Sequence, residues 1–257
     1  MSVPALRSLL DVAIDAAHAA GRHTLAYFGT GTAAVELKAD ETPVTRADRE
    51  AETLVRQIVG RRFPDHGILG EEEGETNAGG PVRWIVDPLD GTKSFVAGVP
   101  LYGTLIGVEV AGEPVVGVCY LPALDELVAA ARGLGCTWNG RPCRASTTAT
   151  LADAVVVTSD ERAARRRSGG WDRLADATRM QRTWGDCYGY VLVATGRADV
   201  MIDPVMNAWD CAPFLPILAE AGGRFTDWRG AATIHGGDAV GTNGVLHDAV
   251  LGLLRDA

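Results

Sequence analysis

The segment WIVDPLDGT, residues 84–92, carries the densest structural and chemical signal in this sequence. Its apolar start predicts a buried strand, and the proline and glycine that follow break regular pairing and force a turn. We therefore expect the side chains of Asp87 and Asp90 to project from the end of a rigid strand. Carboxylates and carbonyls suit Mg²⁺, and Leu89 could offer its backbone carbonyl. Asp-Pro and Asp-Gly pairs also occur in turns without function, so this motif alone leaves both interpretations open.

Two further acidic motifs lie upstream and downstream of this segment. Residues 70–74 read GEEEG, and the adjacent carboxylates Glu71, Glu72 and Glu73 are costly unless they are solvated or bind cations. Residues 208–213 read AWDCAP and place Asp210 at or near the start of a helix that runs to residue 222. Taken singly, the first motif fits a solvated loop and the second an N-terminal helix cap.

Outward from this segment, the chain divides into two patterns of secondary structure. Before it we expect a helix over 5–28, a second helix capped by Thr45 and Asp48, and a Gly-rich loop at 74–80. After it come a hairpin over 104–121, a strand at 126–131 and a tight turn at Asn139-Gly140. The polar stretch 144–153 is the best candidate boundary, which predicts an α+β half over 1–145 and an α/β half over 146–257. In the second half, predicted strands at 154–159, 198–203, 224–228 and 239–243 alternate with helices at 186–195, 210–221 and 246–255.

Composition excludes several classes of function. The formal net charge of −9 opposes binding to a nucleic-acid backbone, and the arginine run at 162–167 fits a solvated helix end and loop. No apolar run is long enough for a membrane span, and Asp11 and Asp15 interrupt the start where a signal peptide would be apolar. The five cysteines show no zinc-ligand spacing, so we expect reduced thiols and a cytoplasmic protein.

The spacing of the two aspartates also bears on the type of chemistry. Phosphatases with an aspartyl nucleophile use an Asp-x-Asp-x-Thr pattern, in which one residue separates the carboxylates. Two residues separate Asp87 from Asp90. Direct attack by a metal-activated water therefore fits better than a phospho-aspartate intermediate.

Taken together and in order, three stretches resemble the inositol monophosphatase superfamily. These are GEEEG, WIVDPLDGTKSFVAGVPLYGTLIGV and AWDCAPFLPILAEAGG, and the resemblance extends from residue 5 to residue 255. Within the superfamily, TKSFVAGVP, TWGDCYGY (183–190) and HGGDAVGTNGVLHDAVL (235–251) are similar to the histidinol-phosphatase branch.

The resemblance implies a layered α-β-α-β-α fold with a site for two or three Mg²⁺ ions. The implied ligands are Glu71, Asp87, Leu89 through its carbonyl, Asp90 and Asp210, with Asp48 near a third, weaker ion. Asp90 and Glu71 thus belong to the catalytic set, together with Glu72 and Thr92, which match positions that hold or activate the attacking water.

The resemblance also implies how a small phosphate monoester binds. Its phosphate would rest on the metals and on the N–H groups of Gly91 and Thr92, beside Lys93 and Asp210. The alcohol part would face Trp184, Gly185, Asp186 and Asp203. Lys93 departs from the threonine of typical inositol monophosphatases.

The leading hypothesis is hydrolysis of histidinol phosphate in histidine biosynthesis. Inositol monophosphate, a 3′-phosphonucleotide and a catalytically silent regulatory relative are the alternatives. The family often forms homodimers, so we expect one here.

Overall fold

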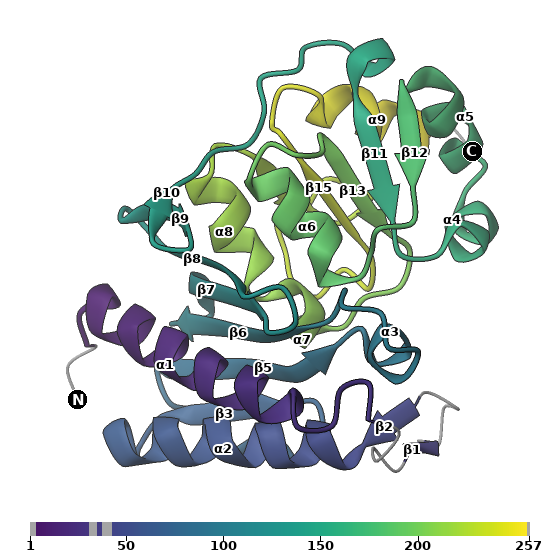
Figure 1. The fold of residues 1–257 in the computed structure, drawn as a ribbon. Helices are drawn as coiled ribbons and strands as arrows, with labels where there is room; N and C mark the ends of the chain where they lie inside the picture. The colour runs from purple at the N-terminus through teal and green to yellow at the C-terminus, as the bar shows by residue number, and fades with distance from the viewer. Residues whose placement is uncertain (1–3, 31–34, 38–42, 256–257) are drawn as a thin grey trace.

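The computed structural model describes residues 4–30, 35–37 and 43–255, and Figure 1 shows its elements stacked in five layers. Helices α1 (Leu6–Thr24) and α2 (Arg46–Arg62) cover one face of a large sheet. Helices α6 (Cys187–Ala194), α7 (Ala208–Cys211) and α8 (Phe214–Glu220) fill the space between this sheet and a second, smaller one. Helices α5 (Gly170–Ala177) and α9 (His247–Arg255) pack on the outer face of the smaller sheet. The predicted α-β-α-β-α layering is confirmed.

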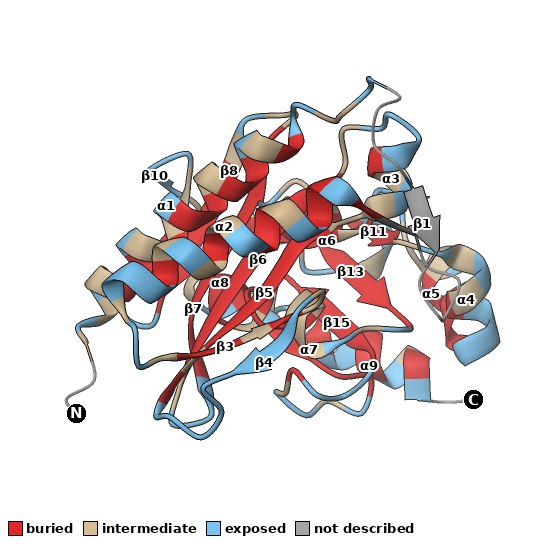
Figure 2. Cartoon of the chain, turned by 90° about the horizontal axis from the view of Figure 1, so that it is seen from below, coloured by how far each residue is buried: buried red, intermediate tan, exposed pale blue. Residues whose placement is uncertain are grey.

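The larger sheet has eight strands in the order β10-β9-β8-β7-β6-β5-β3-β4. Their bounds are β3 (Gly67–Gly70), β4 (Gly74–Thr76), β5 (Val82–Asp90), β6 (Gly103–Val110), β7 (Glu113–Leu121), β8 (Glu126–Ala131), β9 (Gly135–Trp138) and β10 (Arg141–Pro142). All neighbours are antiparallel except β3 and β5. The central strands β5, β6 and β7 are almost entirely buried, as Figure 2 shows, because helices cover both faces. This explains their continuous apolar sequences.

The smaller sheet has five strands in the order β12-β11-β13-β15-β14. Their bounds are β11 (Val155–Thr158), β12 (Met180–Arg182), β13 (Val200–Asp203), β14 (Arg224–Thr226) and β15 (Ala239–Thr242). Strand β11 pairs parallel with β12 and β13, whereas β15 pairs antiparallel with β13 and β14. A short pair, β1 (Val35–Leu37) with β2 (Pro43–Thr45), stands apart from both sheets.

The middle helices approach the larger sheet through two glycines. A Cβ atom at Gly107 on β6 would meet Ala212, and one at Gly117 on β7 would meet the backbone of Pro213. The chain between α7 and α8 therefore passes directly over these strands, which only glycine permits. This close approach sets the position of α7, and with it Asp210, relative to the end of β5.

Several boundaries differ from the expectation. The first helix ends at Thr24 and continues only as turns to residue 29. The Gly-rich segment begins with β4, because Gly74–Thr76 pairs with β3. The predicted helix over 210–221 is two helices, because Pro213 offers no N–H to continue α7. Helix α4 (Glu161–Arg167) contains the arginine run that was expected as a helix end and loop, whereas α5 and β12 were not predicted.

Two other expectations concern the whole chain. Among the described residues, no helix is long and apolar enough to cross a membrane. The cysteines are free thiols, as predicted. The capping box of α2 is also confirmed: Thr45 accepts a hydrogen bond from the N–H of Ala47, and Asp48 accepts one from the N–H of Thr45.

Candidate metal centre and active site

The end of β5 directs Asp87 and Asp90 into one space. The pairing of β5 with β6 is regular up to Asp87 and becomes irregular between Asp87 and Asp90, where Pro88 cannot donate a ladder hydrogen bond. The N–H of Leu89 donates to Asp87 Oδ1 at 2.9 Å, which holds that carboxylate against the turn. Asp90 Oδ2 accepts the N–H of Cys187 at 2.7 Å, so the first residue of α6 fixes the second carboxylate.

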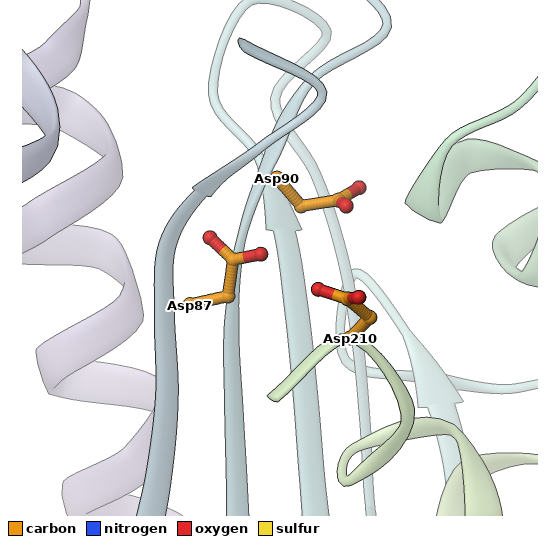
Figure 3. Close-up of side chains that lie close together, drawn as sticks. All are labelled: Asp87, Asp90 and Asp210. Carbon is orange, nitrogen blue, oxygen red and sulfur yellow. The ribbon is translucent and has the colours of Figure 1, made fainter. Parts of the chain in front are cut away.

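Asp210 completes a group of three carboxylates. It lies in the first turn of α7, where its Oδ2 accepts the N–H of Asn207 at 2.7 Å; the N-cap is Asn207, and Asp210 takes part in its capping box rather than being the cap itself. One carboxylate oxygen from each of Asp87, Asp90 and Asp210 lies within 4.8 Å of the others. Figure 3 shows the three side chains facing one another, two from the end of β5 and one from α7.

Burial and mutual repulsion make the ionised form of these three carboxylates unfavourable when no cation is bound. Burial, followed by the charges of Glu71, Asp90 and Asp210, raises the pKa of Asp87 well above its usual value. Burial, followed by the charges of Asp186 and Asp210, does the same to the pKa of Asp90. Burial raises the pKa of Asp210 to about 6. A bound cation would stabilise the ionised form of such clustered, desolvated carboxylates.

Glu71 lies beside this group, at the end of β3. Its N–H donates to the carbonyl of Val86 at 3.1 Å, and it lines the same cavity as the three aspartates. The following two residues are held by Glu52 of α2, a fully buried carboxylate that the sequence analysis missed. Glu52 accepts the N–H of Glu72 at 2.8 Å and that of Glu73 at 3.0 Å. Its signal in the sequence is a glutamate at a buried position of an amphipathic helix.

Asp48 and Glu72 lie near the cavity without lining it. Asp48 is 2% exposed, and burial raises its pKa, with the charge of Glu71 contributing. Its Oδ2 also accepts the hydroxyl of Thr45 at 2.5 Å. The roles of Asp48 at a weaker ion and of Glu72 beside a water therefore stay predictions.

The turn after β5 forms the floor of the cavity. Gly91 has φ of 81°, a left-handed conformation that favours glycine, and it precedes α3 (Thr92–Val96). The hydroxyl of Thr92 donates to the carbonyl of Leu89 at 3.2 Å. Gly91, Thr92 and Lys93 all line the cavity, together with Leu89.

The residues predicted to face the alcohol part divide into two pairs. Asp186 and Asp203 line the cavity, whereas Trp184 and Gly185 do not. Asp203 is 3% exposed and accepts the N–H of Ser159 at 3.2 Å, and burial raises its pKa to about 8. Burial also raises the pKa of Asp186, an effect that the charge of Lys93 partly offsets. Trp184 is 39% exposed, so it is no core aromatic.

All these elements enclose one cavity of about 1050 Å³. Its walls also include residues that the sequence analysis did not assign to a site, namely Ser159, Asp160, Glu161, Arg162, Arg166, Thr183, Val205 and Asn207. The donor atoms that converge at its base are oxygens alone. Oxygen donors with high negative charge fit a hard divalent cation such as Mg²⁺, whereas zinc and copper sites commonly include nitrogen or sulfur ligands.

Comparison with known proteins agrees with this geometry. The model of the "Inositol monophosphatase family" matches residues 5–257. A histidinol-phosphatase of Chlorobaculum parvum is 47% identical over 233 residues, which cover 90% of each chain. A histidinol-phosphatase of Mycobacterium tuberculosis is 41% identical over 94% of this chain and 96% of its own length. The solved structure of an inositol monophosphatase from Anabaena (Nostoc) superposes with a TM-score of 0.86 at 32% identity, covering 98% of this chain and 97% of that one.

Proposed function

Because the chain belongs to the inositol monophosphatase family and is a phosphatase, we propose that it hydrolyses histidinol phosphate to histidinol and phosphate in a Mg²⁺-dependent reaction. Two relatives that match over nearly their whole length carry the name histidinol-phosphatase, which supports this substrate over others of the family. The proposal places the protein in histidine biosynthesis in the cytoplasm. It also includes a homodimer as the working form.

The observation that carries the chemistry is the convergence of Asp87, Asp90 and Asp210 within 4.8 Å. We assign Glu71 and the carbonyl of Leu89 to the same ligand set, and Asp48 to a further, weaker ion. When bound at such a site, two or three Mg²⁺ ions would neutralise the phosphate dianion and lower the pKa of a water molecule.

The remaining groups bind and orient the phosphate ester. Gly91 and Thr92 line the cavity at the start of α3, and we assign their N–H groups to the phosphate oxygens, with Lys93 beside them. Glu72 and Thr92 are assigned to the attacking water. The hydroxyl of Thr92 already donates to the carbonyl of Leu89, so its oxygen is free to accept a hydrogen bond from that water.

The fixed positions of the two aspartates on β5 favour direct attack by water. Asp87 is held by the N–H of Leu89 and Asp90 by the N–H of Cys187, and each of these bonds would resist the movement that a carboxylate nucleophile needs. Reduction of Asp87 to homoserine by borohydride during turnover, which reports an aspartyl phosphate, would contradict this mechanism.

Asp203 and Asp186 are assigned to the ammonium group of histidinol. Asp203 carries a pKa raised to about 8 by burial, and a neighbouring ammonium would lower that pKa and form a charge-assisted hydrogen bond. A neutral sugar alcohol would leave this buried carboxyl without an ionic partner. Trp184 and Gly185 remain in the proposed contact set, although they flank the cavity rather than line it.

Inositol monophosphate is the second candidate substrate, since an inositol monophosphatase shares the fold at 32% identity. A catalytically silent regulatory protein is disfavoured, because every assigned ligand position holds an oxygen donor. The test is phosphate release from histidinol phosphate by EDTA-treated protein as Mg²⁺ is added back. Release that rises from zero with Mg²⁺ supports the proposal, and release without any divalent cation contradicts it.

A further inference from the structure

Two of the five cysteines lie against each other at the edge of the larger sheet. Cys136 is on β9 and Cys143 follows β10, and their Sγ atoms are 3.5 Å apart. In Figure 1 these strands lie at the end of the sheet from which the chain crosses to the smaller sheet. The other three thiols, those of Cys119, Cys187 and Cys211, are at most 1% exposed, whereas Cys143 is half-buried. A reagent in solution can therefore reach Cys143 far more easily than these three.

The hairpin backbone holds the two cysteines directly opposite each other. Its two turn residues, 139 and 140, both have positive φ, as in the turns that match the twist of a tight hairpin. Pro142 pairs with Thr137. The N–H of Cys143 donates to the carbonyl of Cys136 at 3.1 Å, so the cysteines form the next pair of the ladder. Directly opposed residues have Cα atoms about 4.5–5.5 Å apart, within the roughly 4.4–6.8 Å that a disulfide spans. A bond between the two sulfurs therefore requires little movement of the backbone.

A fixed guanidinium contributes positive charge near Cys143. Arg197 lies 4.4 Å from the ring centroid of Trp138 and pairs with Glu126 at 2.6 Å. The hydrogen bond with the Cys136 thiol lowers the pKa of Cys143; burial opposes this effect, and the charge of Arg197 supports it. The same hydrogen bond, together with burial, raises the pKa of Cys136. Of the two sulfurs, that of Cys143 therefore loses its proton first.

This arrangement favours reversible oxidation. The thiolate, not the thiol, is the form that attacks an oxidant, so reactive cysteines are partly exposed and lie in positively charged surroundings. A second thiol within reach converts the first oxidation product to a disulfide before further oxygen is added. Cys143 meets the first condition, and Cys136 supplies the second.

We propose that Cys136 and Cys143 form a redox-active dithiol, which hydrogen peroxide converts reversibly into a disulfide. The Cys143 thiolate attacks the O–O bond and becomes a sulfenic acid, while hydroxide leaves and takes up a proton to give water. The Cys136 thiol then attacks the sulfenic sulfur; the S–S bond forms, and the S–O bond breaks to release a second water. Two thiols and one hydrogen peroxide thus give one disulfide and two water molecules. A dithiol reductant in solution reverses the change.

The disulfide would tie down the edge of the larger sheet. It closes the loop 136–143 just before the polar stretch 144–153, which leads to the second half of the chain. A cross-link restricts the unfolded chain, so oxidation should raise the melting temperature, on the order of a few degrees. This inference goes beyond the proposed function, because neither cysteine lines the catalytic cavity.

The test is peptide mapping of the full-length protein after treatment with hydrogen peroxide at neutral pH and alkylation with iodoacetamide in denaturant. Trypsin leaves both cysteines in one peptide, 133–144, because it does not cleave between Arg141 and Pro142. This peptide should escape alkylation and be lighter by two hydrogen atoms than its reduced form, at peroxide amounts that leave the three buried thiols reduced. The melting temperature should rise with oxidation and return after dithiothreitol is added.

Variants separate the roles of the two sulfurs and of the guanidinium. Cys136→Ser should stop at the Cys143 sulfenic acid, which dimedone traps, and Cys143→Ser should leave Cys136 reduced. Arg197→Gln should slow the alkylation of Cys143 in the native protein several-fold. Arg144→Gln is the matched control, since it removes an exposed arginine next to Cys143 in the sequence, and it should keep the wild-type rate. Equal rates in these two variants would contradict the role of Arg197.

The wild-type protein alone decides the central point. The inference is overturned when peptide 133–144 of the folded protein lacks the disulfide even in a large excess of peroxide, whether its thiols stay free or become sulfinic acid. A disulfide that leaves the melting temperature unchanged would contradict its effect on the sheet edge. No part of this test uses a phosphate ester, so its result is independent of the proposed substrate.

Discussion

The carboxylate of Glu52 accepts the backbone N–H of Glu72 at 2.8 Å, although 20 residues separate them in the sequence. Glu52 is fully buried on α2, and it also accepts the N–H of Glu73 and the guanidinium Nε of Arg56. One buried side chain thus connects the helical layer to the loop that begins with Glu71. The relationship explains how an acidic loop next to a strand end keeps a defined conformation near three other carboxylates.

Glu52→Gln is expected to weaken Mg²⁺ binding through this loop rather than through a metal contact. The amide keeps one acceptor, so one backbone N–H and Arg56 lose part of their bonding. Stability should fall by about 1–3 kcal/mol, and Mg²⁺ affinity roughly ten- to a hundredfold. Thermal melting and the Mg²⁺ dependence of phosphate release measure the two effects. Glu73→Gln, at an exposed glutamate, is the control and should change Mg²⁺ affinity little. Unchanged Mg²⁺ affinity in a folded Glu52→Gln protein would contradict the role of Glu52.

Asp90→Asn should nearly abolish phosphate release while the fold persists. The asparagine oxygen can still accept the N–H of Cys187, so the link to α6 remains. Removing one of three mutually repelling carboxylates should leave the metal-free variant at least as stable as the metal-free wild type. Calorimetric Mg²⁺ titration and thermal melting in EDTA measure both consequences. Near-normal turnover by the folded variant would refute the ligand assignment.

The stability of the metal-free protein should depend on pH in an unusual direction. The pKa values of Asp87 and Asp90 are raised in the folded state, and that of Asp210 is raised from 3.8 to about 6. The folded protein therefore binds more protons than the unfolded chain, so stability from these groups is present below pH 3.8 and is lost as pH rises through the folded pKa values. The melting temperature in EDTA should fall between pH 5 and 8, on the order of a few degrees.

Mg²⁺ should offset this loss, because it stabilises the ionised carboxylates. The rise in melting temperature caused by Mg²⁺ should therefore grow from pH 5 to pH 8. In Asp90→Asn this pH dependence should be smaller. A Mg²⁺ effect that is equal across the range would mean that the three aspartates are not the cation site.

Asp203→Asn should impair hydrolysis selectively. If Asp203 pairs with the ammonium of histidinol, its loss costs one charge-assisted hydrogen bond, which lowers kcat/KM roughly ten- to a hundredfold. Hydrolysis of an uncharged aryl phosphate should barely change, because the carboxylate group and the floor at Gly91 and Thr92 are untouched. Equal slowing of both substrates would show that Asp203 acts on the fold or the metals instead.

Much of this architecture could be predicted from the sequence. The buried strand ending at Asp87 and Asp90, the hairpin β6–β7 and the capped helix α2 all follow from local patterns of apolar, turn and capping residues. Local patterns are informative there because the apolar, turn and capping residues that define each element lie within one short stretch of sequence.

The parts that escaped prediction depend on contacts between distant segments. Helix α4 has a single buried residue, Ala164, and α5 is only 8 residues long, so neither offers a long apolar pattern. The break between α7 and α8 follows from Pro213 and from the close passage over Gly117 on the larger sheet. Neither spacing nor periodicity brings Asp210 to β5 or shows that Arg162 faces the cavity.

The central claim is tested most directly by kcat/KM for histidinol phosphate and for inositol 1-phosphate, measured side by side at saturating Mg²⁺. Our account predicts that histidinol phosphate is preferred by roughly tenfold or more, because its ammonium can pair with Asp203 at the base of the cavity. A preference for inositol 1-phosphate, or equal values for the two, would contradict the substrate assignment.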